Sequence, residues 1–398
     1  MKKRILCGLL LMAAVSGVQA QWLRVWQAGE STRYALSEAT SIPYAAAGST
    51  LTIGEDVYAT AEIDSITIVN PVTITWNEAG ASVDIPESVE GVTAKIDGGN
   101  VIITNVNTWS EQEFVLQGTS AAGSLIYNGE YKTKFHLNGV QLVSVDSAAF
   151  DIECGKRIDL ILEDGTVNSF TDPATGNQKA AFYCRGHLEI GGSGSLTVTG
   201  NCKHALATKE YLFLKKSVGD ITIAKSASDG IHCGEYFQMN GGSINLTMTA
   251  PSTKGIRLDD DATTTTAATI TPEMYINDGE ITVIMQATAL GAKAIASDGN
   301  FTIGTSTTSP TVAVTINADM DDEDERACGL KASNTLLIAG GNTTVDAVGD
   351  NSRGVRANKL RATGGLMKVT NTGDNSQGIK LDNVYVSEGG TVIGKFKY

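Results

Sequence analysis

The chain has 398 residues, of which 44 are Asp or Glu and 30 are Lys or Arg, so its formal net charge is −14 at neutral pH. A chain this acidic repels the phosphate backbone of nucleic acids, and we expect no nucleic-acid partner. Its 43 glycines and its β-branched runs favour an all-β fold with frequent turns over a helical fold.

The first 20 residues have the features of a secretory signal peptide. Three basic residues at positions 2–4 precede an apolar stretch over residues 5–15, and a cleavage site is predicted after Ala20. We therefore expect a secreted protein, located in the periplasm, at the cell surface or outside the cell. No later stretch is long and apolar enough to span a bilayer, so we expect no transmembrane segment.

Residues 21–70 are predicted to form a small β-rich segment before the main domain. The segment shows strand-like alternation, contains Trp22 and Trp26, and closes with the alternating run 63–68. The main domain is predicted to cover residues 71–398. Its first part, up to about residue 142, has short strands with Gly and Asn turns, and we expect it to protect the open end of a repetitive domain.

A repeated phrase dominates the rest of the chain. A small residue followed by an apolar one occurs eight times, and successive copies lie 24, 25, 25, 39, 35, 25 and 24 residues apart. The eight phrases are Ala181-Phe182, Ala205-Leu206, Gly230-Ile231, Gly255-Ile256, Ala294-Ile295, Gly329-Leu330, Gly354-Val355 and Gly378-Ile379. A repeat of this length with strand-like composition is typical of a solenoid, in which each coil buries its apolar face against its neighbours.

Alternation within each repeat assigns side chains to the inside or the outside of the coil. The apolar residue of each phrase is predicted to point inward, and the residue two positions later shares its parity. The residue between these two must point outward. The predicted outward positions are Tyr183, Ala207, His232, Arg257, Ala296, Lys331, Arg356 and Lys380.

Each repeat contains two further short strands that are separated by a Gly-rich turn. Residues 237–239 exemplify the second strand, Asn240-Gly241-Gly242 the turn, and residues 243–248 the third strand. Three short strands in about 25 residues predict a right-handed parallel β-helix. The expected fold class is all-β, with this solenoid preceded by the short β-rich segment.

The cysteines and histidines show no spacing of a metal site. The strand alignment places Cys154 and Cys184 at equivalent inward positions of neighbouring coils, where buried thiols are favoured over a disulfide. The four histidines lie on different coils, which favours structural roles for His136, His187, His204 and His232.

The chain from residue 72 onward resembles a known family. The phrases that carry the resemblance are FHLNGV (135–140), ILEDGTVNSFTD (161–172), GSLTVTG (194–200) and SDGI (228–231). They resemble secreted bacterial carbohydrate-binding domains with a parallel β-helix like that of polysaccharide lyases, and the run 63–68 separately resembles leaders of Bacteroidetes surface proteins. The resemblance implies calcium-assisted binding of an acidic, pectin-like polysaccharide, without a requirement for bond cleavage.

One set of candidate calcium ligands lies in the second of these phrases. Calcium binds roughly six to eight oxygens from carboxylates, amides and backbone carbonyls. Asp164, Asn168 and Asp172 are spaced so that one loop could gather them around an ion. The alternative is an Asp-Gly turn with Asn168 pointing inward.

A second set of candidate calcium ligands follows from the resemblance. Where the family often has Asp before the small residue of the phrase, this chain keeps Asp229 and otherwise has His204, Lys254, Lys293 and Arg353. Asp259 and Asp260 are also candidates, although a charge run of this kind is more typical of a solvated loop.

Basic residues at the outward positions form a candidate ligand-binding column. Arg257, Lys331, Arg356 and Lys380, with His232 one coil earlier, are predicted to line one wall of the solenoid. Just before the repeated phrase stand further candidates for ligand binding, Lys254, Lys293 and Arg353. Such cations fit the repeated carboxylates of a uronate polysaccharide, which Arg binds bidentately. The alternative is an ordinary solvated face.

Together these features predict a secreted protein that binds an acidic polysaccharide with calcium and does not cleave it. One alternative is a polysaccharide lyase, which removes the proton next to a uronate carboxylate, and Arg257 near Asp229 and Asp259 would supply its groups. The other alternative is a surface adhesin whose partner is a protein.

Overall fold

The structure is a computed structural model that describes residues 22–28, 30–35, 50–259, 272–319 and 326–397. The predicted signal peptide, residues 1–20, and the predicted ligand Asp260 lie outside the described residues. The regular elements of the described residues are all β-strands, and these residues include no helix capable of crossing a membrane. The chain divides into two units, Met1–Pro71 and Val72–Tyr398.

The first unit contains two small antiparallel sheets. In one, β1 (Trp22–Gln27) pairs with β2 (Glu30–Ala35) and with β5 (Ser65–Val69). In the other, β3 (Thr50–Ile53) pairs with β4 (Asp56–Ala59). The buried residues of this unit form a separate core of Leu23, Val25, Ile53 and Tyr58.

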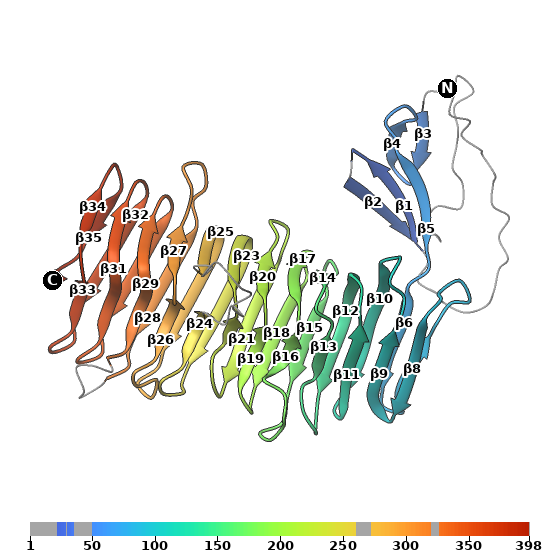
Figure 1. The fold of residues 1–398 in the computed structure, drawn as a ribbon, viewed down its shortest axis with the longest axis horizontal. Coiled ribbons are helices and arrows are strands. Elements are labelled where there is room, and N and C mark those ends of the chain that lie inside the picture. Colours follow the sequence, from blue (N-terminus) through green and yellow to red (C-terminus); the bar gives the residue numbers. More distant parts are fainter. Residues whose placement is uncertain (1–21, 29, 36–49, 260–271, 320–325, 398) are drawn as a thin grey trace, which may run out of the picture. The chain divides into compact units, whose positions relative to one another are not determined.

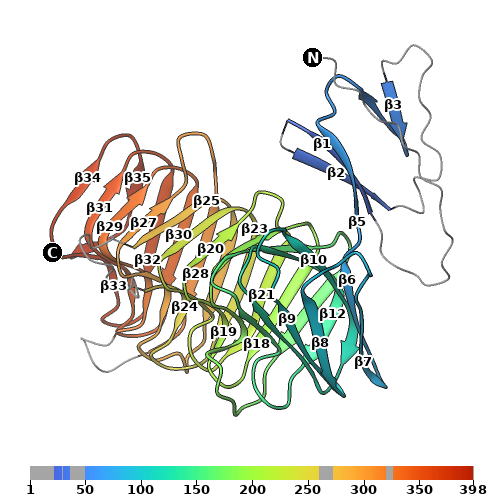
Figure 2. The same cartoon turned by 45° about the vertical axis from the view of Figure 1, so that its right-hand side comes forward.

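Parallel pairing between successive repeats organises the second unit. Its 31 strands are hydrogen bonded into one large sheet, and most of them pair with the strand one repeat further along the chain (Figure 1). Figure 2 shows the strands of successive repeats following one another along this stack. The strands fall into three columns, and we call each repeat of three strands a coil.

The second unit begins with hairpins. Antiparallel pairs are formed by β6 (Val72–Asn77) with β7 (Gly80–Asp84) and by β8 (Val92–Asp97) with β9 (Gly99–Asn105). β10 (Gln112–Ser120) then pairs in parallel with β6 and with β12 (Thr133–Val143). Parallel stacking thus starts beside these hairpins, in the part of the chain where the sequence predicts irregular strands.

The first column contains the repeated phrases. After β9 its strands pair in parallel in the order β11 (Gly123–Gly129), β13 (Phe150–Glu153), β16 (Ala180–Cys184), β19 (His204–Thr208), β22 (Ile231–Cys233), β24 (Lys254–Leu258), β26 (Lys293–Ser297), β29 (Cys328–Ile338), β31 (Arg353–Ala362), β33 (Gln377–Leu381) and β36 (Phe396–Lys397).

The second column runs beside the first. It starts in the first part of β12 and continues through β14 (Arg157–Leu162), β17 (His187–Gly191), β20 (Tyr211–Leu214), the first parts of β23 (Tyr236–Met248) and β25 (Glu273–Met285), β27 (Asn300–Ile303), the last parts of β29 and β31, and β34 (Tyr385–Ser387).

The third column completes each coil. It starts in the last part of β12 and continues through β15 (Val167–Thr171), β18 (Ser195–Gly200), β21 (Asp220–Ser226), the last parts of β23 and β25, β28 (Thr311–Ile316), β30 (Asn342–Ala347), β32 (Leu366–Asn371) and β35 (Thr391–Ile393).

The register of the first column confirms the predicted inward positions. The apolar residues of the eight phrases pair with one another from strand to strand, and each is 0% exposed: Phe182, Leu206, Ile231, Ile256, Ile295, Leu330, Val355 and Ile379. Burying an aliphatic side chain of this size contributes roughly 1.5–3 kcal/mol relative to leaving it in water. The stack of apolar side chains is therefore the main source of stability of the second unit.

In two coils, the Gly-rich turn between the second and third columns is a bend within one continuous strand. β23 and β25 each run through the predicted turn, and their pairing shifts register around Asn240. Gly242 has a φ of +72°, and a Cβ added there would lie 2.4 Å from the Val218 carbonyl oxygen. Glycine is required at this position because a side chain would meet the neighbouring coil.

The cysteines differ from the sequence prediction in their alignment. Cys184 pairs with Ile152, so Cys154 lies two residues beyond the equivalent position and the two do not stack as predicted. Five described cysteines are free thiols, including both of these. The inward line that does form contains Cys184, Thr208 and Cys233.

Candidate functional site

The outward side chains of the second column bring aromatic rings together. The β-strand register places His187, Tyr211, Tyr236 and Glu273 in one line along the stack. The neighbouring line, two residues further along each strand, contains Glu189, Phe213, Gln238 and Tyr275. We call the surface formed by His187, Glu189, Tyr211, Phe213, Tyr236, Gln238 and Tyr275 the aromatic face.

The rings of the aromatic face contact one another across four successive coils. His187 stacks on Tyr211 with ring centroids 4.3 Å apart and an interplanar angle of 16°. Tyr211 meets Tyr236 edge to face at 6.5 Å, and Tyr236 meets Tyr275 at 5.7 Å. All four side chains are only half-buried, so a continuous strip of aromatic surface faces the solvent.

An open depression lies on the aromatic face. It has a volume of about 350 Å³ and is lined by Glu189, Tyr211, Phe213, Tyr236 and Gln238. The Tyr211 hydroxyl donates to Glu189 Oε1 at 2.9 Å, and the Tyr236 hydroxyl donates to Gln238 Oε1. Carboxylate, amide and hydroxyl groups therefore surround the rings and can exchange these bonds for bonds to a ligand.

The tyrosines of this face keep their phenolic protons at physiological pH. Burial, together with the hydrogen bond to Glu189, raises the pKa of Tyr211. Burial and the nearby Glu273 carboxylate also raise the pKa of Tyr236 and of Tyr275. The three phenols thus remain neutral donors, which suits recognition of uncharged hydroxyl groups.

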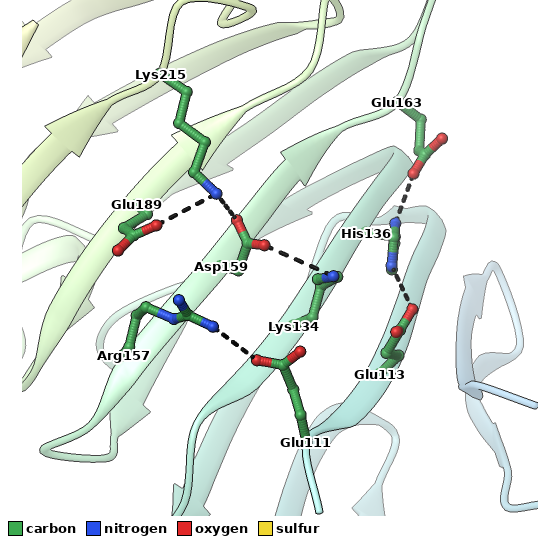
Figure 3. A network of polar contacts seen from close by, with 9 residues as sticks. All are labelled: Glu111, Glu113, Lys134, His136, Arg157, Asp159, Glu163, Glu189 and Lys215. Atoms are coloured by element: carbon green, nitrogen blue, oxygen red, sulfur yellow. Dashed lines mark hydrogen bonds and ion pairs between the residues drawn. The ribbon is translucent and has the colours of Figure 1, made fainter. Parts of the chain in front are cut away.

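Charged residues border the depression on earlier coils. Lys215 Nζ lies 2.5 Å from Asp159 Oδ1 and 3.3 Å from Glu189 Oε2, and Lys134 Nζ lies 3.7 Å from Asp159 Oδ2 (Figure 3). Lys215 thus connects the depression to β14 and β17, the strands of two earlier coils. These contacts fix the Glu189 carboxylate from one side while the Tyr211 hydroxyl holds it from the other.

One further ion pair and two histidine contacts appear in the same view. Arg157 Nη2 lies 3.2 Å from Glu111 Oε1, and although partial burial opposes the charged form, the Glu111 hydrogen bond raises the pKa of Arg157. His136 is buried between Glu163, 2.7 Å from its Nδ1, and Glu113, 3.1 Å from its Nε2 (Figure 3). The predicted structural role suits His136, whose contacts link β10, β12 and the residue that follows β14.

A second open depression contains little that could recognise a ligand specifically. Its volume is about 480 Å³, and its lining is limited to small or hydroxyl residues of turns around Gly340 and Gly364. The aromatic face combines rings, acceptors and donors, so it is the stronger candidate site.

The predicted basic column is aligned as expected but is neutralised by acidic residues. The outward positions His232, Arg257, Ala296, Lys331, Arg356 and Lys380 pair in register from strand to strand, and we call them the charged column. Lys331 Nζ lies 3.9 Å from Asp298, and Arg356 Nη2 lies 3.9 Å from Asp382. Each of these aspartates lies two residues after an outward position of its own strand: Asp298 after Ala296 and Asp382 after Lys380. This pattern is visible in the sequence once the strands are aligned.

Arg257 has the most acidic surroundings in the charged column. Its guanidinium lies 2.6 Å from Asp259, 3.7 Å from Asp229 and 3.8 Å from Asp298. The structure therefore brings together Arg257, Asp229 and Asp259, the groups named for a lyase. Burial and the neighbouring Asp259 raise the pKa of Asp298.

Of the residues just before the repeated phrase, Lys254 and Lys293 are half-buried, whereas Arg353 is buried. Lys254, Lys293 and Arg353 occupy one register line that also includes Cys328. Arg353 is 5% exposed, its Nε donates to Gln377 Oε1 at 3.0 Å, and burial lowers its pKa. As a correction to the predicted ligand-binding role, Arg353 is a buried residue that connects two coils.

The predicted calcium ligands of β15 and its flanking turns have different surroundings. Asn168 is 0% exposed, and its Oδ1 accepts hydrogen bonds from the backbone N–H groups of Gly139 and Val140, both at 3.0 Å. Asp164 lies on an exposed turn and accepts a hydrogen bond from Ser193, whereas Asp172 is 4% exposed. The geometry matches the alternative of an Asp-Gly turn with an inward Asn168 that bonds the neighbouring coil.

Two further predicted ligands, Asp229 and Asp259, are among the described residues and lie near the charged column. Asp229 is 2% exposed, and its Oδ1 accepts the Lys254 N–H at 2.8 Å. Its Oδ2 lies 3.0 Å from His232 Nδ1. Asp259 is half-buried and contacts Arg257, so calcium would have to compete with a guanidinium for this carboxylate.

The aromatic face has a definite chemical preference. A half-exposed ring covers an apolar surface of a ligand, and carboxylate, amide and phenol groups beside it bond to hydroxyl groups. This face was not predicted from the sequence. Alignment of the outward residues of the second strand of each repeat would have brought together His187, Tyr211, Tyr236 and Tyr275. A ligand with apolar faces and hydroxyl-rich edges fits this surface best.

Comparison with known proteins agrees with this preference. Residues 97–376 match the family described as carbohydrate-binding domain-containing protein. A protein of that description from Acetivibrio thermocellus is 27% identical over 138 residues, which cover 32% of this chain and 48% of the relative. The chain thus matches about half the length of that relative.

A solved structure shows a similar fold. The polysaccharide lyase-like protein from C. thermocellum, solved as a gadolinium derivative, superposes with a TM-score of 0.51 at 22% sequence identity, and the match covers 68% of this chain and 97% of that chain. At this identity the likeness concerns the fold alone. Because the family match spans most of the second unit and more than half of the whole chain, this chain belongs to the family of carbohydrate-binding domain-containing proteins.

Proposed function

We propose that this protein binds a polysaccharide along the aromatic face. The observation that carries the proposal is the strip of partly exposed rings, His187, Tyr211, Tyr236 and Tyr275, with a depression of about 350 Å³ beside Tyr211 and Tyr236. Sugar rings have apolar C–H surfaces and polar hydroxyl edges, and both kinds of group find partners here.

An extended ligand suits the face better than a single sugar. The strands of neighbouring coils lie about 4.8 Å apart, and each of four coils contributes one ring. A polymer that lies along the stack contacts several rings at once, so modest contributions from each unit add up. The open depression leaves both ends of such a chain free to continue.

We further propose that the polysaccharide is acidic, that calcium bridges it to the protein, and that the protein is secreted. The charged column supports an acidic ligand, because Arg356 and Lys380 are partly accessible cations on a chain of net charge −14. Calcium would offset the repulsion between two anionic partners. A right-handed winding of the coils belongs to the same proposal, since parallel crossover connections are almost always right-handed.

A lyase is the second candidate, because one observation favours it. Arg257 contacts Asp229, Asp259 and Asp298, so a basic side chain lies beside carboxylates, and a lyase would use the first to abstract the proton next to a uronate carboxylate and the second to hold calcium. Binding alone accounts for the aromatic face, so we place the lyase second.

A glycan array with and without calcium tests the proposed function. We expect polysaccharides to be retained, acidic ones more strongly in the presence of calcium. Retention that does not respond to a chelator would remove calcium from the proposal, and a blank array would favour a protein partner. Incubation with polygalacturonate, monitored by ultraviolet absorbance, tests the lyase, because β-elimination yields an absorbing unsaturated product.

A further inference from the structure

Two histidines and an aspartate converge at the start of the charged column. His204 is the first residue of β19, Asp229 precedes β22, and His232 lies within β22 on the next coil. One ligand atom from each of these side chains lies within 4.8 Å of the other two. In the described part of the chain, this is the cluster of His, Cys, Asp or Glu residues with the spacing that a metal ion needs.

The contacts show which atoms converge. Asp229 Oδ2 lies 3.0 Å from His232 Nδ1 and 3.6 Å from His204 Nδ1. The two imidazole rings are tilted by 32° relative to one another, and their centroids lie 4.5 Å apart. Donor atoms of a tetrahedral zinc site are roughly 3.4 Å apart, since each lies about 2.0–2.2 Å from the metal. Small side-chain rotations would therefore bring all three atoms to an ion.

The three side chains are held in place by the backbone. Asp229 Oδ1 accepts the Lys254 N–H at 2.8 Å, which leaves Oδ2 directed at the histidines. His204 Nδ1 accepts the Asp229 N–H at 3.1 Å, so this nitrogen carries no proton, and an ion bound there takes the place of this hydrogen bond.

A fourth residue supports His232 from the far side. Asp259 Oδ2 lies 3.8 Å from His232 Nε2. If His232 binds an ion through Nδ1, its remaining proton is on Nε2 and faces this carboxylate. A carboxylate behind a metal-binding histidine orients the ring and increases its basicity, and such pairs are common in zinc sites.

We propose that His204, Asp229 and His232 bind a divalent transition-metal ion, for which zinc has the best-matched ligand preferences. Two nitrogen donors and one carboxylate are a usual zinc set, whereas calcium selects oxygen donors. The partial exposure of both histidines, 16% and 14%, leaves a coordination position open to solvent. The site is separate from the aromatic face and requires no carbohydrate.

Arg257 is a competitor for the same carboxylates. Its guanidinium lies 3.7 Å from Asp229 and 2.6 Å from Asp259, where it supplies the positive charge that an ion would bring. A divalent ion next to a guanidinium is opposed by like-charge repulsion. Arg257 can keep its 3.8 Å contact with Asp298 when the ion binds.

Zinc titration of the full chain tests the proposal. The protein is prepared without a histidine tag, stripped with a chelator and titrated with zinc alone in a calorimeter. We expect one strong site per chain that excess calcium does not occupy. His232→Gln and His204→Gln should each weaken zinc binding by at least roughly tenfold to a hundredfold, since loss of a mere supporting residue already costs that much.

Matched controls separate the site from general surface binding. Asp220→Asn removes an exposed carboxylate of the third column, and His187→Gln removes a histidine that lies outside the cluster. Both variants should retain the zinc affinity of the original chain. Arg257→Gln should increase it several-fold, because the competing cation is lost.

A second measurement does not depend on affinity. Cobalt bound in place of zinc should give the visible d–d bands of a tetrahedral nitrogen and oxygen site in the original chain, and the bands should be lost in His232→Gln. Melting curves without metal verify that each variant is folded. The proposal is overturned if the original chain binds zinc no better than a His204→Gln, His232→Gln double variant, or if the controls lose zinc to the same extent.

Discussion

The aromatic face and the charged column obey the same register but offer a ligand different surfaces. On the aromatic face, neighbouring rings contact one another and still remain partly exposed to solvent. In the charged column, Arg257, Lys331 and Arg356 each have a carboxylate within 4 Å. Stacking of the rings thus leaves an apolar strip accessible to a ligand. The aligned cations, in contrast, are paired with Asp side chains that offset their charge.

The charged column also changes character along the stack. On earlier strands its register line passes through Asp151 on β13 and Tyr183 on β16, and on later strands it reaches Arg356 on β31 and Lys380 on β33. Tyr183 is 7% exposed and packs against Ala180 and Ala207, so it does not point freely into solvent as its parity predicts. A ligand that follows this column would meet a carboxylate at one end and cations at the other.

The largest expected effect concerns the apolar interior that supports both surfaces. Ile256→Ala should lower the free energy of unfolding by about 2–5 kcal/mol, because Ile256 is 0% exposed and its removal leaves a cavity. Chemical denaturation measures the change. If the two surfaces are independent, the folded variant keeps its polysaccharide affinity, and a selective loss of affinity would show that interior packing positions the aromatic face.

The next largest effect should come from the rings themselves. The double substitution Tyr211→Ala and Tyr236→Ala should weaken polysaccharide binding by about 2–4 kcal/mol, since large aromatic residues dominate binding energies. Affinity electrophoresis in polysaccharide gels measures this. Tyr211→Phe is the matched control: it keeps the ring, loses the bond to Glu189 and should change affinity much less. Equal losses in both variants would assign binding to the hydroxyl groups.

A pH-dependent effect tests the acidic end of the charged column. Burial raises the pKa of Asp151 to about 6, and within the described residues its Oδ1 has no hydrogen-bond partner. The folded state thus binds this proton more tightly than the unfolded state, whose pKa is about 3.9, so the ionised form destabilises the fold above pH 6. Asp151→Asn should therefore raise stability above pH 6 by about 1–2 kcal/mol, a value discounted for residual solvent contact.

The control for this prediction is the pH profile itself. The difference in melting temperature between Asp151→Asn and the original chain should shrink as the pH falls from 6 to about 3, below the pKa of Asp151 in both the folded and the unfolded state. A difference that stays constant over this range would show that the charge of Asp151 is not its cause.

The smallest effect is expected from the cations at the other end. Arg356→Ala with Lys380→Ala should weaken binding of polygalacturonate by less than about 1 kcal/mol per charge, because exposed ion pairs are weak and Arg356 already faces Asp382. Added salt should reduce the difference further. A loss larger than that of the tyrosine pair would reverse the ranking of the two surfaces.

The sequence was sufficient to predict positions that depend only on strand parity. The inward line from Phe182 to Ile379 and the outward line from His232 to Lys380 follow from a period of 2 within strands and a fixed repeat between them. Family membership in a carbohydrate-binding group was also predicted from short phrases and is confirmed by the match over residues 97–376.

Two kinds of feature could not be predicted in this way: the direction of side chains at strand ends, and contacts between long side chains of different coils. The burial of Arg353 and the offset of Cys154 arise where strands end, and there alternation no longer determines direction. The pairing of Lys331 with Asp298 joins residues 33 positions apart on different coils. His204 and His232 show no metal spacing in the sequence, yet adjacent strands bring them together.

The buried thiols of the interior line of Cys184, Thr208 and Cys233 can report local separation of the coils through their reactivity. Burial raises the pKa of both thiols, and only the thiolate reacts with alkylating reagents. Each cysteine is therefore labelled only when its own coil separates from its neighbours, while the half-buried Cys202 supplies an internal reference on the same molecule. Labelling rates read by mass spectrometry would thus reveal in what order the coils come apart.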